Sequence, residues 1–213
     1  MIGGVAWSDL LDLTLRHLYL AGVPLVVGLL ISLPLGWVAA RYRWTAPTIV
    51  AGTGLLYTIP SLALFILLPL ITGAQILDDS NVLIAMTIYT IALLTRTVTD
   101  GLVSVPQVTR QAATAMGYGE LRRTITVDLP LAIPVITAGL RVAAVSNVSM
   151  VSIAALIGVS QLGSLFTQGF GRNTLDPIVV GVAASVVLAL TLDVAIALVS
   201  RVLTPWLRPG AVQ

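Results

Sequence analysis

QAATAMGYGELRRTITVDLP, residues 111–130, lies between two long apolar segments and carries Gly117, Gly119 and two adjacent arginines. A polar stretch with arginines cannot be solvated by hydrocarbon, so we expect it to lie outside the bilayer. Its small residues and glycines are typical of a docking surface rather than a spacer. The sequence therefore predicts that this stretch receives force from another protein.

The composition is that of an all-α integral membrane protein. Of 213 residues, 57% are hydrophobic and 9% are charged, and the mean hydropathy is +1.02. Soluble domains carry about 25% charged residues, far more than this chain does. At roughly 20 residues for each span, the length accommodates about five or six transmembrane helices and little else. We expect a single membrane domain.

Residue types that are missing exclude several kinds of chemistry. The chain has no cysteine, and every basic residue other than His17 is an arginine. Disulfides, thiolate nucleophiles and cysteine metal sites are excluded, and so is a lysine-containing P-loop. His17 alone does not make a metal site, and we interpret it as structural or interfacial. We expect no catalytic residue, metal, cofactor, bound nucleic acid or enzyme activity.

The hydropathy pattern predicts five transmembrane helices inside one membrane domain, residues 18–207. We expect residues 1–17, which lack the features of a cleaved signal, to form a short amphipathic helix at the interface, and residues 208–213 to form a tail. Residues 159–176 are predicted to form an external loop or a short re-entrant segment. The predicted spans are residues 18–40, 47–72, 82–102, 130–158 and 177–203.

Polar residues and prolines interrupt the predicted spans. Pro60 removes a helical hydrogen bond and predicts a kink in the second span. Arg96 and Asp100 are i,i+4 neighbours near the inner end of the third span, and we interpret them as snorkelling anchors. Asn147 and other polar residues of the fourth span need partners in the membrane, either across a helix interface or along a translocation path.

The distribution of arginines predicts the orientation. With an external N-terminus and five spans, most arginines fall on one side, which the positive-inside rule assigns to the cytoplasm. Arg16 and Arg172 fall outside, and the polar stretch of residues 111–130 falls inside. The arginines predicted to be cytoplasmic are Arg41, Arg43, Arg110, Arg122, Arg123, Arg201 and Arg208.

The polar stretch reads as two short helices, residues 111–116 and 120–126, hinged at the glycines that flank Tyr118. Glycine permits a positive φ at such a turn. Ala112, Ala113 and Ala115 are predicted to form a small-residue surface for a partner, and Arg122 and Arg123 to pair with acidic residues at its rim. Pro130 suits the first turn of the fourth span.

These residues resemble a pattern shared by the permeases of ABC importers. The pattern is E-A-A, three residues, G, nine residues and I-x-L-P, in which Gln here replaces Glu and Val replaces Ile. The matching positions are Gln111, Ala112, Ala113, Gly117, Val127, Leu129 and Pro130. The resemblance implies that the coupling loop, residues 108–129, binds ATPase subunits.

The resemblance covers most of residues 18–203. The segments YTIPSLALF, LVSVPQVTRQAATAMGYGE, LPLAIPVITAGLR and IGVSQLGSLFTQGF look like those of permeases that import glycine betaine, choline and carnitine, with methionine-importer permeases as relatives. It implies a binding-protein-dependent importer permease in a bacterial plasma membrane. The implied partners are two ATP-binding subunits, an extracytoplasmic substrate-binding protein, a second permease chain and membrane lipid.

The residues that contact solute are less well defined by the sequence. Aromatic residues make up 6% of the chain and form no cluster at mid-membrane, so selectivity is expected to reside in the binding protein. Asp193 either attracts a cation or pairs at a helix interface. The candidate translocation path comprises Tyr57, Pro60, Ser61, Asn147, Ser149 and Asp193.

Three other functions were compared with the sequence. The nearest is a permease for methionine or another amino acid. A self-contained channel or secondary transporter would need an internal repeat with paired broken helices, and no convincing repeat is visible. A membrane enzyme or scaffold would need a cluster of catalytic or metal-binding residues, which the sequence lacks.

Overall fold

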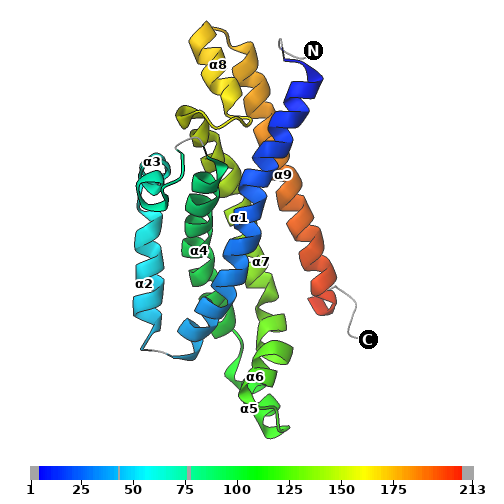
Figure 1. Cartoon of the computed structure of the whole chain (residues 1–213). Coiled ribbons are helices and arrows are strands. Elements are labelled where there is room, and N and C mark those ends of the chain that lie inside the picture. The colour runs from blue at the N-terminus through cyan, green and yellow to red at the C-terminus, as the bar shows by residue number, and fades with distance from the viewer. Residues whose placement is uncertain (1–4, 43, 76–77, 208–213) are drawn as a thin grey trace.

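The computed structural model describes residues 5–42, 44–75 and 78–207, and its secondary-structure elements are all helices. Figure 1 shows an elongated bundle in which α4 lies between α1, α2 and α7. Arg43, Arg208 and the predicted tail lie outside the described residues. The helices are α1 (Trp7–Arg41), α2 (Ala46–Tyr57), α3 (Ser61–Thr72), α4 (Asp79–Val103), α5 (Gln107–Ala115), α6 (Glu120–Arg123), η1 (Thr124–Asp128), α7 (Leu129–Val151), η2 (Ser152–Ile157), α8 (Ser164–Arg172), α9 (Asp176–Leu203) and η3 (Pro205–Leu207).

Among the described residues, four helical segments are long and apolar enough to cross a membrane. They are α1, α4, the continuous segment Glu120–Ile157 and α9. These segments contain the first, third and fifth predicted spans and all but the last residue of the fourth, and the all-α membrane fold is confirmed. A fifth crossing exists if α2 and α3 are counted together as one broken span.

The predicted boundary between an interfacial segment and a first span does not coincide with a break in the helix. Helix α1 runs from Trp7 to Arg41 without a break, so residues 7–17 are its first turns. His17 and Leu20 are fully buried. The two ring nitrogens of His17 lie 3.0 Å from Gln161 Oε1 and 2.9 Å from the Val148 carbonyl oxygen. These contacts hold the start of α1 against the bundle, and His17 is structural.

The kink predicted at Pro60 is a much sharper bend. Helices α2 and α3 meet at 100°, and Pro60 is the N-cap of α3 in an extended conformation. Each helix has 12 residues, or about 18 Å of length, so neither crosses a hydrocarbon core of about 30 Å. The Tyr89 hydroxyl on α4 donates to the Ile59 carbonyl at the bend and satisfies a group that the break frees.

Close packing joins α1 to α4. A Cβ atom at Gly28 would lie 2.5 Å from Thr90 Cγ2, so only glycine allows this approach. Buried Asn147 of α7 reaches the same place, donating to the Ala21 carbonyl at 3.2 Å and contacting Thr90 Oγ1 at 3.0 Å. One side chain thus ties α1, α4 and α7 together with hydrogen bonds that are needed inside an apolar bundle.

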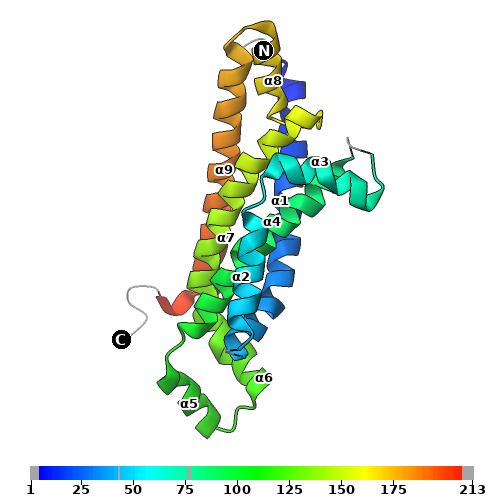
Figure 2. The same cartoon turned by 90° about the vertical axis from the view of Figure 1, so that its left-hand side faces the viewer.

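The two ends of the bundle differ. Figures 1 and 2 show α5 and α6 projecting from one end, beyond the long helices, while α8 and the start of α1 lie at the other. The polar stretch therefore forms a separate projection on the bundle, as a segment outside the bilayer should.

Candidate coupling interface

The projecting loop begins with helix α5, which starts four residues earlier than predicted. Pro106 is its N-cap, and the helix covers Gln107–Ala115. Gly117 has a φ of +85°, which lets the chain reverse, and the Tyr118 N–H donates back to the Ala113 carbonyl at 3.1 Å. The turn predicted at the glycines is confirmed, and Gly117 is the residue whose conformation it requires.

The second predicted short helix is not separate from the fourth span. Helices α6, η1 and α7 form one continuous segment, in which η1 is a π-helical turn. Pro130 therefore lies inside a helix and does not start one, which corrects the prediction. Proline lacks an N–H and clashes with the carbonyl four residues back. The wider π turn, in which the Leu129 N–H donates to the Thr124 carbonyl, precedes this proline and widens the backbone next to it.

A buried carboxylate joins the two arms of the loop. Asp128 Oδ1 lies 3.4 Å from Arg110 Nε on α5, and Asp128 Oδ2 lies 3.4 Å from Arg123 Nε on α6. The Asp128 side chain is 6% exposed. Within the described residues, neither Nε nor Oδ1 makes a hydrogen bond, so charge attraction at contact distance holds this group together. We call these three residues the Asp128 clasp.

Further contacts connect the loop to α1 and α4. Arg41, at the end of α1, donates from Nη2 to Glu120 Oε2 at 3.1 Å, and the Trp37 indole N–H donates to Thr124 Oγ1 at 3.3 Å. Arg110 also donates to the Leu102 carbonyl at the end of α4. The loop therefore contacts α1 and α4 and is continuous with α7, so it is joined to three long helices.

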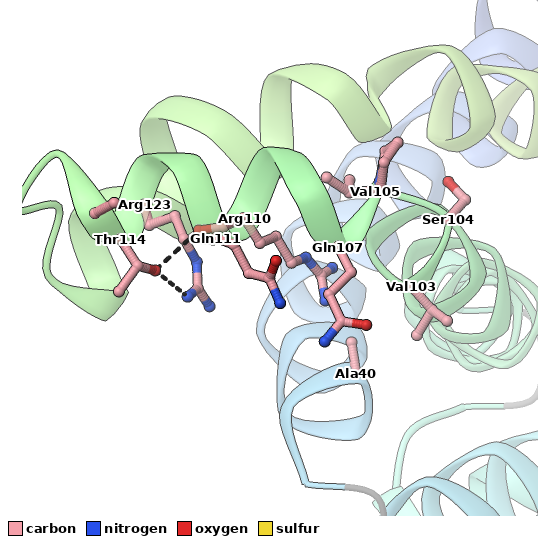
Figure 3. A pocket seen from close by; sticks show the side chains of 11 residues that line it. Ala40, Val103, Ser104, Val105, Gln107, Arg110, Gln111, Thr114 and Arg123 are labelled. Atoms are coloured by element: carbon pink, nitrogen blue, oxygen red, sulfur yellow. Dashed lines mark hydrogen bonds between the residues drawn. The ribbon is translucent and has the colours of Figure 1, made fainter.

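A groove of about 1100 Å³ lies between α5 and the ends of α1 and α4. Figure 3 shows Gln107, Arg110 and Gln111 on the side of α5 that faces Ala40 of α1. Thr114 accepts a hydrogen bond from Arg123 at 3.3 Å at the far end of the groove. Gln111, the first residue of the motif, thus lines a polar groove rather than a flat surface.

The surface of the loop is more apolar than its sequence suggested. Ala113 is 2% exposed and packs inward, so of the predicted alanine surface only Ala112 and Ala115 are exposed. Four larger apolar residues of the loop are exposed: Val108, Met116, Leu121 and Ile125. Large apolar side chains exposed on a protruding element are typical of a protein interface.

The two adjacent arginines have different environments. Arg123 takes part in the Asp128 clasp, so its charge is used within the chain instead of at a partner's rim as predicted. Arg122 is exposed, and its guanidinium stacks 4.8 Å above the Tyr118 ring. Val127, Leu129 and Pro130 are partly buried where the loop joins α7. Of the two arginines, Arg122 is the one placed to meet a partner.

Sequence reasoning missed several residues of this interface. Asp128 occupies the variable position of the I-x-L-P pattern, and Arg110 precedes the motif. The loop carries three arginines and two acids, Glu120 and Asp128, so an acid able to pair with an arginine was the available signal for the clasp. The contacts of Trp37 and Arg41 join residues far apart in the chain, and no local pattern gives them.

The candidate path residues are not gathered in one place. Asn147 is buried between three helices, and Asp193 of α9 forms a bidentate ion pair with Arg141 of α7, with both contacts at 2.7 Å. Tyr57 is 39% exposed and packs edge-on against Tyr89 beside the bend that contains Pro60 and Ser61. Ser149 is exposed on α7. Asn147 and Asp193 thus occupy helix interfaces within the single chain.

No group of three or more metal-ligating side chains occurs among the described residues. At the end of the bundle opposite α5, a polar cavity of about 510 Å³ lies between α1, α8 and α9. Its polar lining includes Asp9, Gln168, Arg172 and Asp176.

Residues 32–209 match the family described as binding-protein-dependent transport system inner membrane component. The osmoprotectant import permease protein OsmW of Salmonella typhimurium strain LT2 is 32% identical over 201 residues, which cover 92% of each chain. The glycine betaine/carnitine/choline transport system permease protein OpuCD of Bacillus subtilis strain 168 is 28% identical over 191 residues, covering 89% of this chain and 82% of that one.

Solved structures of importers have the same fold. An inward-facing structure of the MetNI methionine ABC transporter superposes with a TM-score of 0.81 at 20% identity, covering 92% of this chain and 96% of that chain. An amino acid ABC transporter determined with histidines gives a TM-score of 0.75 at 18% identity, covering 91% and 94%.

Proposed function

The chain belongs to the family of binding-protein-dependent transport system inner membrane components, and from this premise we propose that it is the permease subunit of an ATP-driven importer of quaternary-amine osmoprotectants. It is a multi-pass membrane protein of a family of permeases. The similar permeases with curated names carry osmoprotectants, glycine betaine, carnitine or choline, and they match over most of their length. The likeness to the methionine transporter, at 20% identity, supports the fold and not the solute.

The observation that carries the proposal is the projecting loop with its exposed apolar side chains and its contacts to three long helices. Met116, Leu121 and Ile125 offer apolar contact area to a partner, and exposed Arg122 offers a charge. We propose that two ATP-binding subunits dock here, one on each of two permease chains. The chain contains no lysine and therefore no P-loop of the usual kind, so ATP energy must come from such a partner.

The transport cycle follows from this docking. ATP binding closes the two ATPase subunits and draws the paired loops together, and the long helices then change from an inward-open to an outward-open packing. Hydrolysis resets them. The permease needs two packings that differ by a few kcal/mol, because a ligand shifts such an equilibrium by its differential affinity. The inward-facing structures that superpose on this chain are consistent with one of these packings.

The proposed orientation has the N-terminus outside and α5 in the cytoplasm. The arginines that carry this argument are Arg41, Arg110, Arg122, Arg123 and Arg201 among the described residues. The polar cavity with Asp9 and Arg172 then faces the extracytoplasmic side, where a substrate-binding protein would deliver solute. The second permease is either a second copy of this chain or a related permease. Identifying the permease chain that co-purifies with this one distinguishes the two.

Uptake by the reconstituted complex tests the proposal. The permease, its ATPase and its binding protein are placed in proteoliposomes, and uptake of labelled glycine betaine, choline, carnitine and methionine is compared with ATP inside and outside. We expect uptake of at least one quaternary amine that requires internal ATP and the binding protein. Uptake of methionine alone would replace the proposed solute, and uptake without any ATPase would overturn the importer itself.

A further inference from the structure

Charged residues inside the membrane-spanning helices are few and are placed unevenly. Residues 18–40 of α1 and residues 46–72 of the broken pair contain none, and residues 177–200 of α9 contain Asp193, which pairs with Arg141. The exposed side chains of α1 in this range include Val26, Leu30 and Ile31, which suit lipid. Helix α4 differs, because it carries Arg96 and Asp100 on its exposed side.

These two α4 side chains are far more exposed than the rest of their helix. Arg96 is 74% exposed and Asp100 is 66% exposed, although α4 is the most buried of the four long segments. The two form an i,i+4 ion pair with Arg96 Nε 3.7 Å from Asp100 Oδ2. Arg96 lies seven residues, or about 10 Å, before the end of α4 at Val103. A charged pair within a spanning helix either snorkels to the interface, as the sequence interpretation has it, or meets water or a polar partner.

Helical geometry places an exposed stripe of α7 beside this pair. A Cβ atom at Gly139 of α7 would clash with the Thr97 side chain of α4, which fixes the contact between the two antiparallel helices. Arg96 directly precedes Thr97 in α4, and Ala138 directly precedes Gly139 in α7. Each side chain therefore lies about 100° around its own helix from the contact between the two helices. In antiparallel helices the same rotation from a shared contact leads to the same side, so Arg96 and Ala138 lie on one face.

This face continues along α7 at helical spacing. Seen along α7, the residues of this face are all exposed. We define the α4–α7 face as Arg96, Asp100, Leu131, Val135, Ala138, Val142, Val145 and Ser149. Its α7 side chains are apolar except for Ser149, and Ala138 and Val135, at the level of the two charges, are small. Arg141, whose side chain is 45% exposed, lies at its edge beside α9.

The exposed ion pair distinguishes the α4–α7 face from the other exposed faces of the long helices. The α7 side chains beside the two charges are apolar and cannot hydrogen bond to them, and lipid tails cannot solvate them. The small side chains of α7 instead leave room next to the charges for water or for a solute. The exposed side chains of α1 and the exposed valines and leucines of α9 are apolar by comparison, and they suit contact with lipid.

We propose that the α4–α7 face lines the water-filled path of the importer and that Arg96 and Asp100 contact the solute in transit. This inference rests on the proposed function, because it assumes a transported solute. A zwitterion such as glycine betaine presents a carboxylate to Arg96 and an ammonium group to Asp100. Choline, which has no carboxylate, engages Asp100 alone. The internal ion pair keeps both charges neutralised when no solute is present.

The absence of cysteine from the chain makes accessibility a direct test. Arg96→Cys and Asp100→Cys are compared with Leu198→Cys, an exposed apolar position five residues before the end of α9. Each variant is assembled with its partners in liposomes and treated with a charged, membrane-impermeant thiol reagent. We expect the α4 cysteines to react at least tenfold faster, and a fluorophore at position 198 alone to be quenched by spin-labelled lipid. Equal lipid quenching at all three positions would overturn the proposal.

The reactivity must also depend on the state of the transporter. ATP with vanadate, which traps the closed ATPase state, should change the labelling rate at positions 96 and 100 because the path changes its side of access. Labelling that is blocked in every state would instead indicate that a second permease chain covers the face, and it would overturn the assignment to the path.

Solute specificity separates contact with solute from a structural role. Arg96→Gln should raise the KM for glycine betaine by about two- to fivefold, the range of an exposed charge pair, and leave that for choline unchanged. Asp100→Asn should raise both. Equal loss for both solutes in Arg96→Gln, with normal ATPase activity, would indicate that the pair is structural. If the unaltered complex transports neither solute, the proposed function fails, while the cysteine accessibility still tests the face.

Discussion

Asp128 Oδ1 lies 3.4 Å from Arg110 Nε, and this contact joins the arm of the loop that leaves α4 to the arm that enters α7. Because Arg123 approaches the other carboxylate oxygen, one buried acid is balanced by two arginines that are each less than a third exposed. The Asp128 clasp therefore sets the position of α5 relative to the membrane helices.

The clasp predicts the effect of removing its carboxylate. Asp128→Asn leaves two arginines without their counter-charge, at a cost of about 2–3 kcal/mol, the lower end for a broken buried pair because both guanidinium groups are partly exposed. We expect faster proteolysis in the loop and loss of coupled uptake, measured on the assembled complex. The matched variant Asp12→Asn changes an exposed acid near the start of α1 and should alter neither. Equal sensitivity of both variants to protease would contradict the clasp.

The turn at Gly117 gives a prediction that depends on backbone conformation alone. Gly117 has a φ of +85° and Gly119 has a φ of −64°, and a Cβ atom at either would meet nothing within 4 Å. Gly117→Val should strain the loop by about 1–2 kcal/mol, the cost of a left-handed conformation for other residues. Substrate-stimulated ATPase activity and uptake should both fall, whereas Gly119→Val should leave them near normal. Undiminished values in Gly117→Val would show that this turn is not needed for coupling.

Packing between α1 and α4 predicts a difference between two Gly→Ala changes. A Cβ atom at Gly28 would lie 2.5 Å from Thr90 Cγ2, but one at Gly52 of α2 would lie in open space. Both changes raise helix propensity equally, so their difference isolates the clash. Gly28→Ala should be less stable than Gly52→Ala by about 1–3 kcal/mol, as for overpacked cores, measured by thermal unfolding in detergent. Similar midpoints for the two variants would contradict the close approach.

The Arg141–Asp193 ion pair predicts that a double variant is more stable than the effects of the two single variants would suggest. Removing one partner by Arg141→Leu or Asp193→Leu leaves a single charge between α7 and α9 inside the membrane-spanning region, so each variant should unfold at a lower temperature. The double variant leaves no charge and should recover most of the loss. If the double variant is as unstable as the sum of the two single ones, the ion pair does not hold these helices together.

Particular residues show which parts of the fold and of the candidate interface could be predicted from the sequence. The spans, the turn at Gly117 and the break at Pro60 follow from hydropathy and from backbone limits, which are local properties. The continuity of α6 with α7 was missed because Pro130 normally marks a helix start, and the π turn that accommodates it depends on neighbours. The inward position of Ala113 and the balance of Asp128 by two arginines arise from tertiary contacts, which no motif spacing contains.

The roles of His17 and Asn147 could not be predicted from the sequence for the same reason, because they depend on tertiary contacts. Each polar side chain looks out of place in an apolar helix, and the sequence supports either a functional or a structural interpretation. Their partners, the Val148 carbonyl for His17 and the Ala21 carbonyl for Asn147, are backbone atoms on distant helices. Backbone carbonyls carry no sequence signal, so only the packing shows which atoms these two side chains contact.

The helical segment from Glu120 to Ile157 has 38 residues and a length of about 57 Å. It is helical throughout, and its regular α-helical turns are interrupted near the start by the wider π turn at Thr124–Asp128. Its far end carries the carbonyls of Val148 and Val151, which contact the His17 ring and the Gln161 amide. Continuous helical backbone therefore connects Glu120 of the projecting loop to the opposite end of the bundle, where His17 and Gln161 lie.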